Sequence, residues 1–227
     1  MKKVAVLLAG SGVYDGSEIH ESVFALLALD QRGIEYQCIA PNRDQHHVVN
    51  HLNGEEMAEQ RNILVESARI ARGEIMALDA IDVHDFDGLV IPGGFGAAKN
   101  LNQWALSGPE GLLFEDVKKL ILAFNESNKA ICGLCMGPTV IAQALCDLGE
   151  GLNLTVGSTK EASPYDIAGI SGGMEGLGVS TCEKTLAEFA VSEEHKVVTA
   201  PCYMMEGSIS AIQKNIDMAI EAFAKLL

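Results

Sequence analysis

Short apolar runs alternate with longer amphipathic stretches along most of the chain. The apolar runs cover residues 4–8, 36–40, 88–92, 130–134, 154–156 and 196–200, and each has the length of a buried strand. Helical spacing of apolar positions covers residues 18–31, 62–71, 109–125, 138–148 and 208–227. This alternation predicts an α/β fold built on a doubly wound, mostly parallel sheet with helices on both faces.

Three other segments depart from the simple alternation. Residues 189–192 and 196–200 are strand-like and joined by a short turn that contains His195, which predicts an antiparallel hairpin. Residues 169–178 are rich in glycine, and we expect a loop there. Residues 41–60 form a long polar insertion.

The first predicted helix carries two carboxylates in its first turn. Glu18 and Glu21 are three residues apart and therefore share one face. We expect both to point away from the core, because the opposite face carries an apolar stripe of Ile19, Val23, Leu26 and Leu27. Acidic residues are also favoured in the first turn of any helix by the helix dipole, so the spacing alone does not assign them a catalytic role.

Length and composition favour a single domain over residues 1–227, because 227 residues with 48% hydrophobic content supply a large core. The formal net charge of −15 opposes binding to nucleic acid or to anionic membranes. Six scattered cysteines do not resemble a disulfide framework, and the apolar run after Lys3 is short for a secretory signal. We therefore expect a cytoplasmic protein.

The segment around Cys135 has the pattern of a nucleophile elbow, a sharp turn from a strand into a helix that presents a reactive side chain. Gly133 and Gly137 leave room for such a turn, and Pro138 suits the first turn of a helix. A cysteine at a helix N-terminus is expected to have a lowered thiol pKa. Cys132 and Cys135 also form a C-x-x-C pair, but Cys132 lies within the predicted strand, which disfavours a redox dithiol or a zinc site.

Three further features belong to the same edge of the sheet or to the insertion. Gly93 and Gly94 follow a predicted strand, where their backbone N–H groups could face a bound oxyanion. Cys202 follows the last strand and is best interpreted as a small core residue. His46, His47 and His51 form a histidine cluster in the polar insertion, but its surroundings are typical of a solvated loop. We expect neither a metal nor a cofactor.

Several stretches together resemble one branch of a known superfamily. Residues 11–21, 50–55, 61–75 and 92–101, the elbow, and Thr199-Ala200-Pro201 are similar to the ElbB branch of the ThiJ/PfpI, class I glutamine amidotransferase-like superfamily. The resemblance implies a flavodoxin-like domain that is usually a homodimer. It also implies that Cys135 is the nucleophile and that Glu21 is the neighbouring carboxylic acid, with Glu18 as the alternative.

The resemblance further assigns the oxyanion-binding amides to Gly93, Gly94 and Met136. Met136 follows the nucleophile where protease-like relatives carry a histidine, so a Cys-His-Glu hydrolase is not expected. The implied activity is a cofactor-independent glyoxalase that converts a small dicarbonyl such as glyoxal to a hydroxy acid such as glycolate. The alternative is a redox-sensing or regulatory protein that uses the same cysteine and is linked to isoprenoid metabolism.

Overall fold

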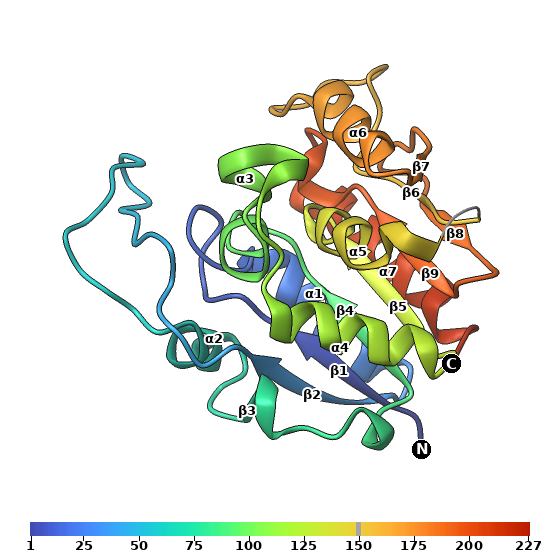
Figure 1. Ribbon diagram of the computed structural model, residues 1–227, viewed down its shortest axis with the longest axis horizontal. Helices are drawn as coiled ribbons and strands as arrows, with labels where there is room; N and C mark the ends of the chain where they lie inside the picture. Colours follow the sequence, from blue (N-terminus) through green and yellow to red (C-terminus); the bar gives the residue numbers. More distant parts are fainter. Residues whose placement is uncertain (149–150) are drawn as a thin grey trace.

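A seven-stranded sheet forms the centre of the computed structural model, which describes residues 1–148 and 151–227 (Figure 1). All neighbouring strands pair in parallel except the last two, which form the predicted antiparallel hairpin. The sheet has a flavodoxin-like, mostly parallel architecture, as predicted. In spatial order its strands are β3 (Ile75–Ala77), β2 (Glu35–Ala40), β1 (Lys3–Leu7), β4 (Gly88–Ile91), β5 (Ala130–Leu134), β9 (Val197–Ala200) and β8 (Ala190–Ser192).

Helices cover both faces of this sheet (Figure 1). On one face, α1 (Ile19–Gln31) packs against α7 (Ile209–Ala224), and on the other α4 (Glu115–Glu126) packs against α5 (Gly137–Leu145). The strands β4, β5 and β9 are buried along their whole length, which explains why they read as continuous apolar runs. No helix in the described part of the chain is both long and apolar enough to span a membrane.

Smaller elements lie around the carboxyl ends of the central strands. The helix α2 (Ile63–Ile70) contacts α1 and β2, and the short α3 (Trp104–Ser107) contacts a π-helical turn, η3 (Ala97–Leu101). A second, two-stranded sheet pairs β6 (Asn153–Leu154) with β7 (Ser180–Thr181). The apolar run at 154–156 was therefore wrongly predicted as a strand of the main sheet.

One loop prediction and one predicted helix start need correction. The glycine-rich segment 169–178 is largely helical, in α6 (Ile167–Gly176), because the Asp166 side chain accepts a hydrogen bond from the Gly169 N–H and caps the helix. The helix predicted from residue 109 begins only at Glu115, since Pro109 lies in a separate 3-10 turn. The cap at Asp166 that starts α6 leaves no signal in hydrophobic spacing.

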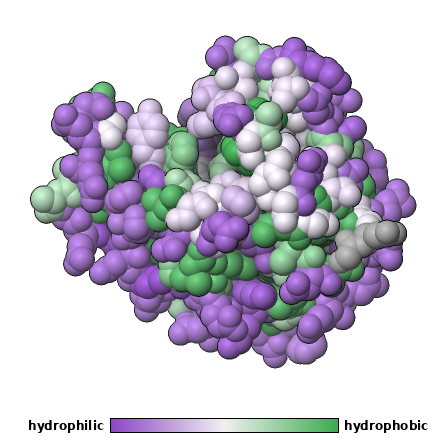
Figure 2. All heavy atoms as spheres, turned by 45° about the horizontal axis from the view of Figure 1, so that its top comes forward, coloured by the Kyte–Doolittle hydropathy of each residue, from purple (hydrophilic) through white to green (hydrophobic). Residues whose placement is uncertain are grey.

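The polar insertion forms an extended arm, which we define as residues 41–62. It contains no helix or strand, as the sequence predicted, and it stands out at the left of Figure 1. Isolated bridges between Asp44 and Asn62 and between Val49 and Glu56 fold the arm back on itself. Figure 2 shows a notch between the arm and the rest of the molecule, with apolar and polar residues side by side at its floor.

Asn100 ties the arm to the carboxyl end of β1. Its side chain is 2% exposed, and Nδ2 donates to the backbone oxygens of Ala9 at 2.8 Å and Asp15 at 2.9 Å. Its Oδ1 accepts a hydrogen bond from the His46 N–H at 2.9 Å. One buried amide therefore fixes three segments that are distant in sequence.

We expect Asn100→Ala to lower the free energy of unfolding by about 2–4 kcal/mol, because it leaves buried backbone groups without partners. The control is Asn53→Ala at the exposed tip of the arm, where the cost should stay within about 0.5 kcal/mol. Urea unfolding followed by circular dichroism measures both. Equal losses in the two variants would contradict the role assigned to Asn100.

Candidate active site

Cys135 lies at the junction of β5 and α5 with a left-handed backbone, φ 56°. Its side chain is 4% exposed. Only a residue without a side chain fits two positions later, because a Cβ on Gly137 would lie 2.5 Å from the Ile91 oxygen. Cys135 therefore has the backbone geometry of a nucleophile elbow.

Glu21 is the carboxyl group beside this thiol. It is fully buried, and its Oε2 accepts a hydrogen bond from the Gly93 N–H at 3.1 Å while Oε1 accepts one from the Tyr203 N–H, also at 3.1 Å. Its carboxyl group lies beside the Cys135 thiol, and the two groups interact. Burial, together with the charge of Glu18, raises the pKa of Glu21 to about 8.

This burial reverses the orientation that we expected for α1. Val23, for example, is 45% exposed, whereas the buried face consists of small or polar residues together with Leu29. Of the four stripe residues only Leu26 packs against the core, and Glu21 does not point away from it. The exposed positions of the stripe are Ile19, Val23 and Leu27, and the buried ones on the opposite side are Glu21, Ser22, Ala25, Ala28 and Leu29.

Glu18 acts on Glu21 from the helix cap. Its Oε2 accepts a hydrogen bond from the Glu21 N–H at 2.7 Å, so Glu18 is the N-cap residue of α1. Burial raises the pKa of Glu18, although its hydrogen bond with the Glu21 N–H opposes the increase. Glu21, not Glu18, is the carboxyl group in contact with the sulfur of Cys135.

The pKa of the Cys135 thiol is raised, whereas the sequence predicted that it would be lowered. Burial and the neighbouring Glu21 raise the pKa of Cys135, although the backbone amides of Gly94 and Met136 oppose this increase. The N-terminus of α5 does not compensate for the loss of water around a buried sulfur. Cys135 is therefore a protonated thiol at neutral pH, and the neighbouring Glu21 can accept its proton once its own carboxyl group is ionised.

The three predicted oxyanion amides fall into two groups. The Gly93 N–H donates a hydrogen bond to Oε2 of Glu21 and holds that carboxyl group in place. The Gly94 and Met136 amides instead face the Cys135 sulfur. An oxygen on a carbon bound to that sulfur would lie close to these two amides, which makes Gly94 and Met136 the better candidates for an oxyanion-binding pair.

A cavity of about 560 Å³ opens beside this centre. Tyr165 lines it, and burial together with the charges of Cys135 and Glu21 raises the pKa of its hydroxyl to about 12. Tyr203 also lines it, and its hydroxyl hydrogen-bonds to Nδ1 of His20 at 2.8 Å. The lining residues are Val13, Glu18, His20, Pro164, Tyr165, Tyr203, Met205, Glu206 and Gly207.

Sequence reasoning missed Tyr165 and Tyr203. Tyr165 lies in the loop before α6, and Tyr203 reaches Glu21 through its backbone N–H, so neither leaves a signal in hydrophobic spacing. Cys202 is fully buried after β9, and its thiol and the backbone N–H of Cys135 both donate to the Ala200 oxygen, at 3.6 and 3.0 Å. Cys132 is buried within β5, as expected.

The predicted histidine cluster lies on the arm and not at this centre. His47 pairs with Glu56 at 3.8 Å, and His51 faces Asp15 at the same distance. Within the described residues, no group of three or more histidine, cysteine, aspartate or glutamate side chains is arranged to hold a metal ion.

Comparison with known proteins gives the family. The chain is 37% identical over 226 residues to the human glutamine amidotransferase-like class 1 domain-containing protein 3, mitochondrial, covering 99% of this chain and 83% of the relative. The chain belongs to the class I glutamine amidotransferase-like family. No family model matches it.

Solved structures agree with this family. The crystal structure of an isoprenoid biosynthesis protein with an amidotransferase-like domain from Ehrlichia chaffeensis has a TM-score of 0.90 at 31% identity, over 100% of this chain and 99% of that one. A ThiJ/PfpI domain protein from Brachyspira murdochii has a TM-score of 0.55 at 15% identity, over 99% and 96%, and shares the fold. The name of the human family member places that protein in mitochondria, so a cytoplasmic location for this chain stays a prediction.

We expect Gly93→Ala to disrupt the centre, because the added Cβ would lie 2.4 Å from Cβ of Cys135 and 2.8 Å from Oε2 of Glu21. Overpacking of this kind costs about 1–3 kcal/mol of unfolding free energy. The control is Gly172→Ala within α6, where nothing lies within 4 Å of the added atom, and a gain of about 0.5–1 kcal/mol is expected. Thermal unfolding compares the two, and a stable Gly93→Ala protein with unchanged Cys135 alkylation would refute this packing argument.

Proposed function

We propose that this protein is a cofactor-independent glyoxalase of the ElbB type, which converts a small dicarbonyl such as glyoxal to a hydroxy acid such as glycolate. The observation that carries the proposal is the close approach of the buried Glu21 carboxyl group to the thiol of Cys135 on its elbow, in a centre that also offers two backbone amides. A cavity of about 560 Å³ beside it is of a size typical of small-molecule sites.

The first step is addition of the thiol to one carbonyl of the dicarbonyl. The ionised carboxylate of Glu21 accepts the proton from Cys135, the sulfur forms a bond to the carbonyl carbon, and the proton passes to the carbonyl oxygen. The product is a hemithioacetal. The Gly94 and Met136 amides would stabilise the negative charge that develops on that oxygen during addition.

The second step is an internal proton transfer. Glu21 removes the hydrogen from the carbon bound to sulfur, and the resulting enediol takes a proton at the adjacent carbon, which gives a thioester of a hydroxy acid. Water then cleaves the carbon–sulfur bond, releases the hydroxy acid and restores the thiol. Glyoxal plus one water thus gives glycolic acid without an external oxidant or reductant.

The proposal includes a homodimer and a small dicarbonyl as the partners of this chain. The redox-sensing alternative requires a thiolate that peroxide can reach. Cys135 is instead 4% exposed with a raised pKa, which favours chemistry assisted by Glu21.

We expect Cys135→Ala to abolish glycolate formation from glyoxal while the protein stays folded. Glu21→Gln should lower kcat by about 10²–10⁴-fold, because the amide cannot accept the thiol proton. Glu18→Gln should retain most of the activity, since the glutamine oxygen can still cap α1. Glycolate is quantified by chromatography after incubation with metal-stripped, glutathione-free protein. Full activity of Cys135→Ala would refute the mechanism, and a larger loss for Glu18→Gln would transfer the acid–base role.

The raised pKa of Glu21, at about 8, predicts the pH dependence. The carboxyl group must be ionised to accept the thiol proton, so kcat/KM should rise between about pH 6.5 and 9 with a midpoint near pH 8. Glu18→Gln removes a negative charge that raises this pKa, and its midpoint should therefore move to lower pH. Initial rates across this range test both statements, and a midpoint that moves upward in Glu18→Gln would contradict them.

A further inference from the structure

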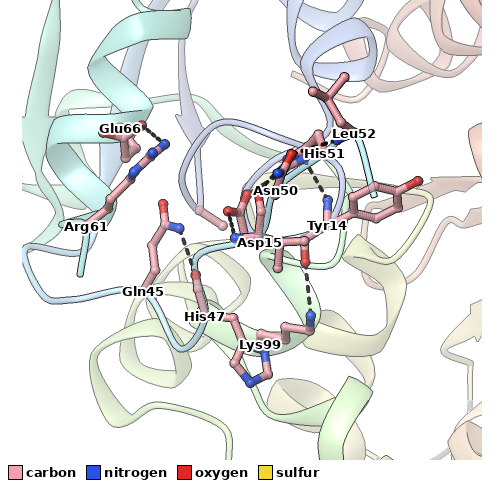
Figure 3. A network of polar contacts seen from close by, with 12 residues as sticks. Tyr14, Asp15, Gln45, His47, Asn50, His51, Leu52, Arg61, Glu66 and Lys99 are labelled. Atoms are coloured by element: carbon pink, nitrogen blue, oxygen red, sulfur yellow. Dashed lines mark hydrogen bonds and ion pairs between the residues drawn. The ribbon is translucent and has the colours of Figure 1, made fainter. Parts of the chain in front are cut away.

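A second cavity, of about 470 Å³, lies where segments outside the proposed reaction converge. Tyr14 comes from the loop after β1, Val49 and Gly54 from the arm, and Phe95 and Lys99 from the segment after β4. Ala105 of α3 completes the lining. Figure 3 shows the polar contacts that join these segments, with Lys99 reaching toward Tyr14 and His51 of the arm packed beside Tyr14.

Lys99 places a positive charge at this cavity. Its Nζ donates to the backbone oxygen of Tyr14 at 3.0 Å and lies 5.3 Å from the centre of the Phe95 ring. An ammonium group has three donor hydrogens, so two remain for another partner. Among the residues that the structure describes, no carboxylate forms an ion pair with Lys99.

The nearby carboxylates of Asp15 and Glu56 contact other groups, and neither forms an ion pair with Lys99. Oδ2 of Asp15 accepts a hydrogen bond from the Val49 N–H at 2.8 Å, and Oδ1 lies 3.8 Å from Nε2 of His51. Glu56 pairs with Nε2 of His47 at 3.8 Å. Both carboxylates attract Lys99 only from a distance, and burial lowers the pKa of its ammonium group.

A histidine of the arm also lies near Lys99. Burial lowers the pKa of His46, and the charges of His47 and Lys99 lower it further, so His46 adds no second positive charge beside Lys99 at neutral pH. The chain has 31 acidic residues against 16 lysines and arginines, yet none of the acidic side chains in the described structure closes over Lys99. A half-buried cation with free donors and no ion pair loses hydration without full compensation. An anionic ligand would supply that compensation.

We propose that this second cavity binds a small organic anion, with a carboxylate or a phosphate monoester on the ammonium group of Lys99 and an apolar or aromatic body against Tyr14 and Phe95. The Tyr14 ring is fixed from behind by His51, whose ring centroid lies 4.8 Å away. His51 Nε2 also accepts the Tyr14 N–H at 3.2 Å. The aromatic wall is thereby set in position before any ligand enters.

This binding site is distinct from the cavity beside Cys135 but shares a wall with it. The Phe95 ring packs edge-on against Tyr165, with 5.7 Å between ring centroids, and Tyr165 lines the first cavity. Phe95 also directly follows Gly94, whose amide faces the sulfur. Binding of the anion does not depend on the chemistry proposed for Cys135.

The test is isothermal titration calorimetry of the full chain with three matched probes: benzoate, phenyl phosphate and the neutral benzamide. We expect at least one of the two anions to bind and benzamide to bind at least about tenfold more weakly. The preferred anion identifies the ligand as a carboxylate or a phosphate ester. Binding of neither anion, or equal binding of benzamide, would overturn the proposal.

Variants locate the ligand. Lys99→Met keeps the aliphatic part of the side chain but removes its charge, and we expect it to weaken anion binding about tenfold or more. Lys99→Arg keeps the charge, and its affinity for the anion should stay within about threefold of wild type. Lys119→Met on the exposed face of α4 is the control for a lost charge and should leave affinity unchanged. Melting temperatures show that each variant is folded.

Cys135→Ala separates the two cavities. Unchanged affinity in this variant, together with the loss in Lys99→Met, supports a site at Lys99. Loss of binding in Cys135→Ala, or wild-type affinity in a folded Lys99→Met protein, would place the ligand elsewhere and refute the proposal.

Discussion

The candidate site depends on one buried carboxyl group held by two backbone amides from different strand ends. Gly93 follows β4 and Tyr203 follows β9, and both N–H groups donate to Glu21 of α1. A carboxyl group without water needs such partners, because an unpaired buried polar group costs free energy. The same contacts place the carboxyl group against the elbow at the end of β5, so folding of the sheet edge and assembly of the chemistry are one event.

This arrangement also explains why the pKa of the thiol is raised. A helix N-terminus and two amides favour a thiolate, but burial and an adjacent carboxyl group favour the thiol, and the second pair of effects is larger. Reactivity then requires transfer of the proton within the pair.

Much of the fold follows from short-range patterns. The strand Ala130–Leu134 was predicted at its observed bounds because it is apolar throughout and flanked by a polar residue and the elbow. Cys135 was identifiable for the same reason, since glycines and a proline at fixed positions are required by the turn itself. The helix α6 was missed because its glycines hide the cap at Asp166. Tyr165 and Tyr203 were missed because loops bring them to the site, and loop paths are set by tertiary contacts such as those of Asn100.

Hydrophobic spacing alone did not separate Glu18 from Glu21, which the family resemblance ranked in favour of Glu21, because α1 has an unusual division of faces. The helix buries a carboxyl group and exposes Val23, so the side that looks apolar is not the side that packs on the sheet. Hydropathy would therefore rank these positions in the wrong order for tolerance to mutation. A library that randomises α1 should retain diverse residues at Val23 and very few at Glu21, and a redesign that exchanges buried polar residues for apolar ones would remove the centre while appearing to improve the core.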